Sequence, residues 1–339
     1  MIQHGGHAET GMHLMRKRNK RRSGNCNSLA AADRRGPAGG CFFDAKTEIA
    51  RQNEVYGKTI QRGKDMNNIV LLDGSCGSAL WAMAEARGIK KDPTWKYNVE
   101  HPELVLELHR RYIAVGSDMI QTNTFAVNGP SVKRSSSYSV EKIIRSAAEL
   151  AKQAAEGTGV KTYLSCGPLT QLLEPYGDLE EDECRAFYDE ITAAAAAGGV
   201  DAIMLETFMD LEMMKIAAAS ALSRNLPVIC SMTFEKKHRT MLGNKIEQIC
   251  EELAPMGVEA VGMNCSKGPV EALEVIREFR EFTDLPLYFK PNSGMGETYS
   301  AKQFADEIAP ALDLVKYVGG CCGTDESYIA ELRNRIDQR

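Results

Sequence analysis

The sequence contains no apolar run near the roughly 18 to 20 residues that a membrane-spanning helix needs, and no secretory leader is evident. It has neither of the glycine-rich phosphate loops, G-x-G-x-x-G and G-x-x-x-x-G-K-[ST]. An excess of positive charge is also missing, because the formal net charge at pH 7 is −5. The lack of a long apolar run argues against a membrane protein, and the charge argues against nucleic acid as the main partner. The missing phosphate loops argue against a doubly wound open sheet. We therefore expect a soluble, cytoplasmic protein.

Cysteine is present, but not in the pattern of a disulfide framework. Ten cysteines in 339 residues lack the dense, even spacing of a small secreted domain, so we interpret them as reduced thiols and clustered ones as candidate metal ligands. A single cysteine is more often a small buried apolar residue than a ligand. On that ground five are expected to be structural: Cys76, Cys166, Cys184, Cys230 and Cys250. Three histidines show no spacing typical of a ligand or a base: His101, His109 and His238.

The first 65 residues differ in charge from the rest. They carry 13 Lys and Arg against 6 Asp and Glu, whereas residues 66–339 carry 28 against 40. They also lack a sustained apolar period, so we expect a basic, disordered N-terminal extension. A targeting or nucleic-acid-binding arm is one interpretation, which the interspersed acidic residues and the lack of an amphipathic stripe weaken. We favour two other interpretations together. Residues 1–65 are a solvated tail, and they lie outside the natural product, because Met66 is a usable translation start.

From residue 66 onward, short apolar runs alternate with helical periods. Eight runs have the length and composition of buried parallel strands: 69–74, 118–122, 162–165, 201–206, 227–232, 258–265, 286–290 and 314–318. Helical periods lie between and after them: 78–87, 102–115, 140–156, 178–197, 211–223, 245–256, 270–282, 301–312 and 325–339. Eight strands in this length match the ~250 residues typical of a closed barrel. We predict an α/β fold, a (β/α)8 TIM barrel formed by residues 66–339 as one domain.

Polar residues stand where most of these strands end. In a (β/α)8 barrel the carboxyl ends of the strands meet at one face, so residues far apart in sequence become neighbours there. The candidates at this face are Asp73, Asn123, Glu206, Cys265, Asn292, Cys321 and Cys322. Taken alone, Asp73 could be a turn residue and Glu206 could cap the following helix. Their common position favours two carboxylates that hold the ammonium group of a ligand.

Cys321 and Cys322 lie between glycines, where the last strand ends, and Cys265 follows an earlier strand. Three thiolates around Zn²⁺ leave one of four tetrahedral positions open, which is the pattern of a catalytic zinc site. An incoming thiol bound there would be held as a thiolate at neutral pH and could attack an electrophilic carbon. A disulfide between the two adjacent cysteines is the alternative, but it would be strained and disfavoured in a reducing compartment.

Six motifs together resemble the homocysteine S-methyltransferase family over residues 69 to 336. They are Leu72-Asp73-Gly74, Gln121-Thr122-Asn123-Thr124-Phe125, Met204-Leu205-Glu206-Thr207, Gly262-Met263-Asn264-Cys265-Ser266-Lys267-Gly268-Pro269, Lys290-Pro291-Asn292-Ser293-Gly294 and Gly319-Gly320-Cys321-Cys322-Gly323-Thr324. The resemblance implies a zinc-dependent barrel that transfers a methyl group to the thiolate of homocysteine and gives methionine. It also implies that Cys265, Cys321 and Cys322 are the zinc ligands.

The same resemblance implies how the substrate is bound. Asp73 and Glu206 would hold the amino-acid end of homocysteine, and Asn123 is a further candidate contact. Backbone amides from Gly74 to Gly77 would bind its carboxylate, although Ser75-Cys76-Gly77-Ser78 departs from the usual family pattern there. Asn264 would fill the fourth zinc position when substrate is absent.

Within the family, Thr122-Asn123-Thr124-Phe125 and Cys322-Gly323-Thr324 resemble the homocysteine module of cobalamin-dependent methionine synthase more than the members that use S-methylmethionine or betaine. The Asp-x-His-x-x-Gly motif of a cobalamin module does not occur, so methylcobalamin would come on a separate corrinoid protein. Two alternatives stay open. One is a corrinoid-protein-dependent methyltransferase with another thiol acceptor or methyl donor. The other is a zinc protein that binds a thiol amino acid without catalysis.

If the natural product begins at Met66, protein isolated from its native source will have the mass of residues 66–339. Intact-mass analysis measures this directly. A mass equal to the 37.3 kDa of the full chain would contradict the start-site hypothesis.

Overall fold

The computed structural model describes residues 69–265, 267–294 and 298–339. The expected basic extension, residues 1–65, lies outside these described residues. Within them, eight parallel strands form one sheet in the order β1-β8-β7-β6-β5-β4-β3-β2. The strands are β1 (Val70–Leu71), β2 (Met119–Gln121), β3 (Lys161–Cys166), β4 (Ala202–Phe208), β5 (Val228–Met232), β6 (Ala260–Asn264), β7 (Leu287–Lys290) and β8 (Tyr317–Val318).

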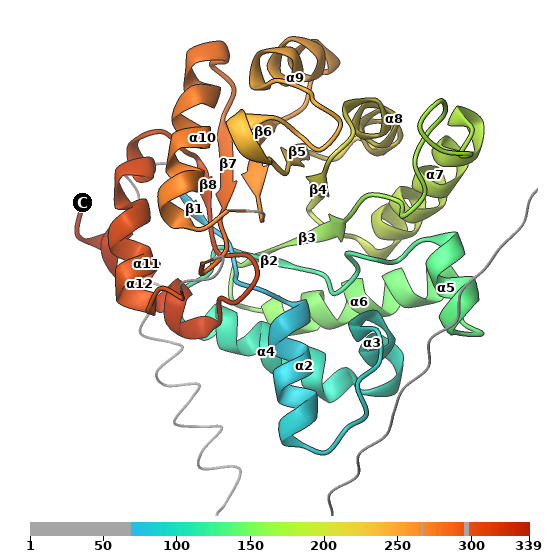
Figure 1. Cartoon of the computed structure of the whole chain (residues 1–339). Coiled ribbons are helices and arrows are strands. Elements are labelled where there is room, and N and C mark those ends of the chain that lie inside the picture. The colour runs from blue at the N-terminus through green and yellow to red at the C-terminus, as the bar shows by residue number, and fades with distance from the viewer. Residues whose placement is uncertain (1–68, 266, 295–297) are drawn as a thin grey trace, which may run out of the picture. The chain divides into compact units, whose positions relative to one another are not determined.

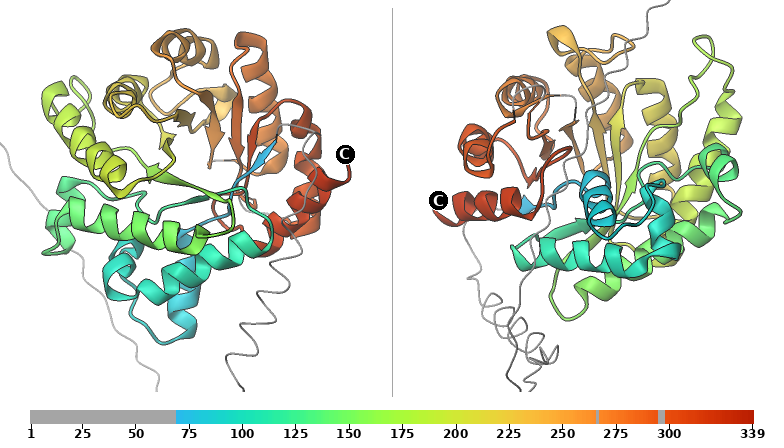
Figure 2. Two further views of the ribbon diagram at one scale, coloured as in Figure 1. Left: turned by 180° about the vertical axis from the view of Figure 1, so that it is seen from behind. Right: turned by 60° about the horizontal axis from the view of Figure 1, so that its bottom comes forward.

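Helices surround these strands on the outside, as Figure 1 and the reverse view in Figure 2 show. They are α2 (Gly77–Ala86), α3 (Tyr97–Glu100), α4 (Pro102–Ala114), α5 (Gly129–Ser135), α6 (Val140–Ala155), α7 (Glu181–Gly198), α8 (Leu211–Leu222), α9 (Ile246–Leu253), α10 (Pro269–Phe282), α11 (Ala301–Ile308) and α12 (Glu326–Asp337). The predicted (β/α)8 barrel is confirmed, with strand and helix ends shifted by a few residues. The short helices α3 and α5 were not predicted.

Nearly all strand residues are buried, so the two sets of alternate residues in the sheet pack into two separate cores. Outward-facing residues pack against the helices in the large core. Inward-facing residues fill the barrel with a second, smaller apolar cluster: Leu72, Met119, Tyr163, Ala202, Met204, Ile229, Ala260, Tyr288 and Tyr317. The barrel interior is therefore a packed floor, and any site has to lie above it at the carboxyl ends of the strands.

Side chains close the barrel between its first and second strands. The sheet order of the described residues has no β1–β2 pair. Instead, Asp118 donates its backbone N–H to Leu71 O (2.7 Å) and accepts from Leu71 N at Oδ2 (2.8 Å). One level higher, Gln121 N donates to Asp73 Oδ2 (2.7 Å). The carboxylates of Asp118 and Asp73 thus accept hydrogen bonds that backbone carbonyls of a neighbouring strand would otherwise accept. They satisfy backbone N–H groups that would be unpaired without them.

Polar side chains define several helix starts. Asn128, Ser139, Asp210 and Ser300 each accept a hydrogen bond from a backbone N–H in the first turn of the following helix, and at Ser300 the pairing with Gln303 forms a complete capping box. Among the described residues, no helix is both long and apolar enough to cross a bilayer.

Candidate active site

The three predicted cysteine ligands come together at the carboxyl ends of β6 and β8. The Sγ atoms of Cys265, Cys321 and Cys322 all lie within 4.8 Å of one another, and those of Cys265 and Cys322 are 3.8 Å apart. Cys265 and Cys321 are partly buried, whereas Cys322 is exposed. The cluster is therefore open to solvent on one side, at the end of the barrel where the sequence predicted a site.

Backbone hydrogen bonds between neighbouring loops hold the cysteines in place. Cys265 N donates to Lys290 O (3.0 Å), Cys321 N donates to Pro291 O (2.8 Å), and Cys322 N donates to Asn292 Oδ1 (3.1 Å). Cys265 itself has a left-handed backbone, with φ of 58°. Such a conformation is unfavourable for a residue with a Cβ and persists only where surrounding contacts impose it. Here it turns the chain so that the thiol faces those of the other loop.

The donor set fits a soft divalent cation such as Zn²⁺. Three cysteine sulfurs within bonding reach of one centre match the ligands that zinc accepts. Hydrogen bonding to Cys265 raises the pKa of Cys322 to about 11, and hydrogen bonds to both neighbouring thiols, together with burial, raise that of Cys321. Three thiolates this close repel one another, and a bound dication would offset that repulsion.

The Asn264 side chain connects the cysteine cluster to the rest of the site. It is fully buried, and its Oδ1 accepts from Ser231 Oγ (2.7 Å) and Thr207 N (2.8 Å). Its Nδ2 donates to Thr207 Oγ1 (2.7 Å) and contacts Glu206 Oε2 (3.4 Å) and Cys321 Sγ (3.8 Å). Because Oδ1 already accepts two hydrogen bonds, this arrangement favours a positioning role for Asn264 over that of a fourth metal ligand.

Asp73 lies at the end of β1 and is 1% exposed. Its Oδ1 accepts from Tyr163 Oη (2.8 Å) and Lys290 Nζ (3.0 Å), and its Oδ2 accepts from Gln121 N. The predicted carboxylate is therefore at the site, but protein groups already bind both of its oxygens.

Glu206, two residues before the end of β4, is the second predicted carboxylate. It is 5% exposed, and Ser165 Oγ donates a short hydrogen bond to its Oε1. Burial raises the pKa of Glu206, while Lys290 and the Ser165 hydrogen bond act in the opposite direction. The residue after it, Thr207, has φ of 66°, a second strained position beside the site.

The two other predicted contacts have structural partners. Asn123 Nδ2 donates to Thr94 O (2.6 Å) and Asn98 Oδ1 (3.2 Å), so its amide ties the end of β2 to the segment before α4. Gly74 packs so closely that a Cβ there would lie 2.8 Å from Tyr112 Oη. Helix α2 begins at Gly77, and its N-terminal amides offer partial positive charge to an anion. The nearby Ser75 N already donates to Thr324.

Sequence reasoning missed Lys290, Tyr163 and Tyr288. Lys290 is 1% exposed, although it ends a strand that is buried throughout. Burial would lower its pKa, but Asp73, Glu206 and Cys321 raise it above its usual range. Tyr288 Oη is buried without a hydrogen-bond partner among the described residues. A lysine at the end of an apolar strand was the signal that could have identified this residue. A charged residue is almost never fully buried without a partner, so a buried lysine predicts a carboxylate nearby.

Most of the remaining cysteines are buried, as the structural interpretation predicted: Cys166, Cys184, Cys230 and Cys250. Cys76 is partly exposed. Burial of its sulfur contributes most to raising its pKa, and the charges of Asp73, Lys290 and Glu206 also act on that pKa. Cys76 therefore lies in the region of the site. His109 is buried on α4, and burial lowers its pKa to about 4 although Asp73 opposes the shift. It is therefore a neutral residue at neutral pH.

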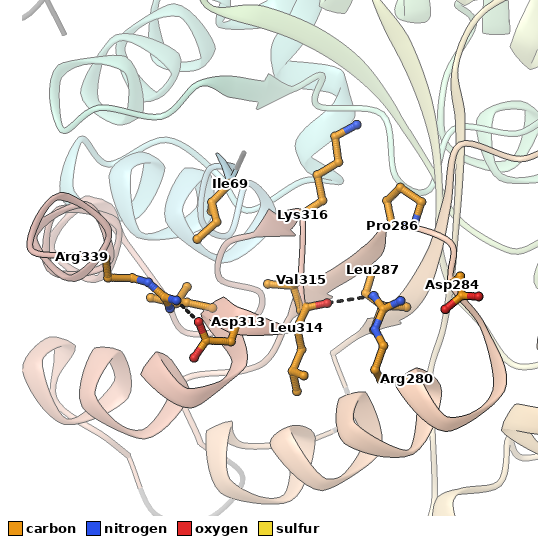
Figure 3. A pocket seen from close by; sticks show the side chains of 11 residues that line it. Ile69, Arg280, Asp284, Pro286, Leu287, Asp313, Leu314, Val315, Lys316 and Arg339 are labelled. Atoms are coloured by element: carbon orange, nitrogen blue, oxygen red, sulfur yellow. Dashed lines mark hydrogen bonds and ion pairs between the residues drawn. The ribbon is translucent and has the colours of Figure 1, made fainter. Parts of the chain in front are cut away.

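A separate hollow of about 330 Å³ lies at the opposite end of the barrel, where β7 and β8 begin (Figure 3). Its cations have partners within the chain. Arg280 donates to Leu314 O (2.9 Å), Arg339 pairs with Asp313, and Lys316 pairs with Glu259 (2.8 Å). This hollow is distant from the strand ends that carry the cysteines and has no comparable chemistry.

These features define a (β/α)8 barrel with a thiol cluster and two buried carboxylates at its catalytic face. The chain belongs to the homocysteine S-methyltransferase family, because the model of that family matches residues 70–336. The family resemblance inferred from the motifs is thus confirmed.

Two relatives are large enzymes. Methionine synthase of Mycobacterium tuberculosis is 30% identical over 295 residues, which cover 78% of this chain and 24% of that protein. Methionine synthase of Mycobacterium leprae is 30% identical over 262 residues, with coverage of 69% and 21%. The chain therefore spans less than a quarter of the length of these relatives.

Solved structures of a smaller protein superpose along nearly their whole length. The apo form of the homocysteine methyltransferase MmuM from Escherichia coli is 25% identical, with a TM-score of 0.66, and the match covers 80% of this chain and 97% of that one. The metallated form of MmuM is 24% identical, with a TM-score of 0.67 and the same coverage.

Tyr163 and Tyr288, two of the inward-facing tyrosines, make a matched pair for measuring the site's hydrogen bonds. Tyr163→Phe should lower the free energy of unfolding by about 1.5 to 3 kcal/mol, because a buried carboxylate loses a donor. Tyr288→Phe should leave it unchanged or slightly higher, since its hydroxyl has no partner among the described residues. Urea denaturation of both variants measures the difference. Equal destabilisation by the two changes would contradict this assignment.

Proposed function

We propose that this protein transfers a methyl group to the sulfur of homocysteine and forms methionine. The observation that carries the proposal is the cluster of Cys265, Cys321 and Cys322, open on one side and linked through Asn264 to a buried carboxylate. A thiol amino acid presents a sulfur and an ammonium group, and this site offers a place for each. Cysteines that must remain reduced also suit the cytoplasm.

Cys265, Cys321 and Cys322 would hold Zn²⁺ through their three sulfurs. The metal, when bound, supplies a fourth position at which a substrate thiol is kept as a thiolate at neutral pH. The protein's own residues position this centre. Asn264 fixes the orientation of Cys321 and Glu206 together, because one amide group contacts both.

The substrate's amino-acid end would lie toward the two buried carboxylates, Asp73 and Glu206. Its carboxylate would face the start of α2, where Gly77 and the residues before it present backbone amides. Gly74 allows Tyr112 and Thr324 to pack against this loop, and Asn123 supports the adjoining wall through Asn98. Held in this way, the sulfur has one open direction, on the side where Cys322 is exposed. The methyl donor would approach from there, and fixed alignment would accelerate the in-line transfer.

Metal content tests the assignment of the ligands. The protein should contain about one zinc per chain, and Cys322→Ala should lose zinc and lower turnover by more than about 100-fold, which exceeds the 10- to 100-fold typical of a residue that only supports a ligand. Elemental analysis and methionine formation are the measurements. Cys250→Ala, at a buried cysteine on α9, is the control that should retain zinc. Full zinc and full turnover in Cys322→Ala would contradict the proposal.

The methyl donor is best identified with a panel. The motif resemblance to the homocysteine module of cobalamin-dependent methionine synthase favours a methylated corrinoid as the donor. With homocysteine as acceptor, we expect methylcobalamin to give more methionine than S-methylmethionine or betaine. Methionine formation with each donor, measured by mass spectrometry, checks this. A preference for S-methylmethionine or betaine would contradict the corrinoid hypothesis, and homocysteine binding without product from any donor would favour a binding protein.

A further inference from the structure

Six large apolar side chains are exposed among the described residues, and four of them surround the mouth of the barrel. Tyr176 is 70% exposed, Met241 53%, Phe125 45% and Val270 43%. Each belongs to a segment that follows the carboxyl end of a strand, so all four lie on the face that carries the cysteine cluster. Exposed apolar side chains gathered on one face are typical of an interface with another protein.

Two of these side chains lie on long loops. Residues 167–180 connect β3 to α7 and carry Tyr176, and residues 233–245 connect β5 to α9 and carry Met241. Connections of this kind are usually about two to six residues long, and much longer ones are usually functional. The connection after β4, between the two loops, consists only of Met209 and Asp210. Two long loops therefore flank a short one at the mouth.

The two long loops have opposite charge. Residues 167–180, the acidic loop, contain three acidic residues and no Lys or Arg. Residues 233–245, the basic loop, contain four Lys and Arg and one acidic residue. In the described part of the chain, the ion pairs of these two loops are limited to those of His238 with α10. The other charges of both loops are thus available to a partner.

Hydrogen bonds within each loop hold it in one conformation. In the acidic loop, Glu174 N donates to Leu179 O (3.1 Å), and Leu179 is fully buried. In the basic loop, Thr240 N donates to Asn244 O (3.1 Å), and Thr240 is buried. Association through loops that are already ordered loses less conformational entropy than association through loops that must first fold.

These features are arranged symmetrically about β4. In the sheet, β3 and β5 flank β4, and β2 and β6 lie one strand further out on either side (Figure 1). A two-fold axis that lies across the mouth and passes over β4 exchanges the acidic loop with the basic loop. The same axis exchanges the segment after β2, which carries Phe125, with the segment after β6, which carries Val270. A two-fold dimer requires a self-complementary surface of this kind.

We propose that the mouth of the barrel is the surface through which two copies of this chain associate, acidic loop against basic loop. Tyr176 of one copy then lies against Met241 of the other, and contacts between an aromatic ring and a thioether are favourable. Phe125 and Val270 form the second apolar contact. The association itself is independent of the proposed function.

The dimer has a consequence for the site that rests on the proposed function. A second copy over the mouth covers the side on which Cys322 is exposed, which is the side from which the methyl donor would approach. The monomer is then the active form, and the dimer is closed to the donor. Protein concentration and salt, which screens the charges of the two loops, would both regulate access to the site.

Sedimentation velocity of the zinc-loaded full chain measures the association. We expect a reversible dimer with a dissociation constant of about 1 to 100 μM, which rises at least about tenfold from low to high salt. Tyr176→Ser with Met241→Ser should weaken the dimer at least about tenfold, because apolar anchors dominate interface energies. A chain that stays monomeric up to about 200 μM at low salt would overturn the inference.

Charge exchange tests which surfaces meet. Glu174→Lys with Asp178→Lys makes both loops basic, and Lys236→Glu with Lys237→Glu makes both loops acidic. Neither variant should associate alone, whereas an equimolar mixture of the two should form a heterodimer within about tenfold of the wild-type affinity. Circular dichroism and melting temperature verify folding. Failure of the mixture to associate, or unchanged association of either variant alone, would overturn the assignment of the interface.

A matched control changes the net charge equally at the other end of the barrel. Lys152→Glu with Lys161→Glu replaces two exposed lysines, near the end of α6 and at the start of β3, and should dimerise like wild type. Loss of the dimer in this variant would show that net charge, and not the two loops, controls association. If the loop charge variants do not fold, the Tyr176→Ser with Met241→Ser variant decides.

Activity separates this inference from the proposed function. With homocysteine and methylcobalamin, methionine formed per chain should fall as wild-type concentration rises through the dissociation constant. In the Glu174→Lys with Asp178→Lys variant it should stay constant. Constant activity of a dimerising wild type would overturn the closure of the site. Absence of methionine with every donor would overturn the proposed function and the closure, while sedimentation would still decide the interface.

Discussion

Closure of eight parallel strands into a barrel is the constraint on which the rest of this structure depends. Successive residues of a strand face opposite sides of the sheet, and nearly all of them are buried. The position of a residue along its strand therefore determines which core it packs into. The last inward-facing residue of a strand lies above the apolar interior and next to its counterparts from other strands. Gln121, Ser165, Glu206, Asn264 and Lys290 occupy such positions, and they form the hydrogen-bonded layer on which the cysteine cluster rests.

Much of this architecture is predictable from the sequence, because each strand is a short apolar run bounded by glycine, proline or a charged residue. All eight strands were located in this way, and the positions of the three cysteines just beyond strand ends predicted their convergence. The helices α3 and α5 were not predicted, since four and seven residues are too few to show an apolar period. α5 also begins with Gly129 and Pro130 after Asn128, a run that is equally typical of a turn.

The partners of the buried charges could not be predicted in the same way. Lys290 and Asp73 are 217 residues apart in sequence, and their bond depends on which inward-facing side chains reach across the barrel. A sequence shows that a lysine ends an apolar strand, but not which carboxylate it meets. The left-handed backbone at Cys265 and Thr207 is equally hidden, because neither residue favours that conformation and only the surrounding contacts impose it. Prediction therefore located the strand ends and the three cysteines that meet there, while the pairing of the buried charges required the fold.

The same pairing decides how charge is distributed in the site. Lys290 forms its ion pair with Asp73, and its charge also acts on Glu206 and Cys321, so one buried cation faces several acidic groups. Three neighbouring thiols resist ionisation unless a dication is present, and a buried glutamate resists ionisation unless an ammonium group is near. Metal and amino thiol would then each neutralise a different part of one anionic site. Asn264 contacts both Cys321 and Glu206, so under the proposed function it would help to set the spacing between the sulfur and the ammonium group of the ligand.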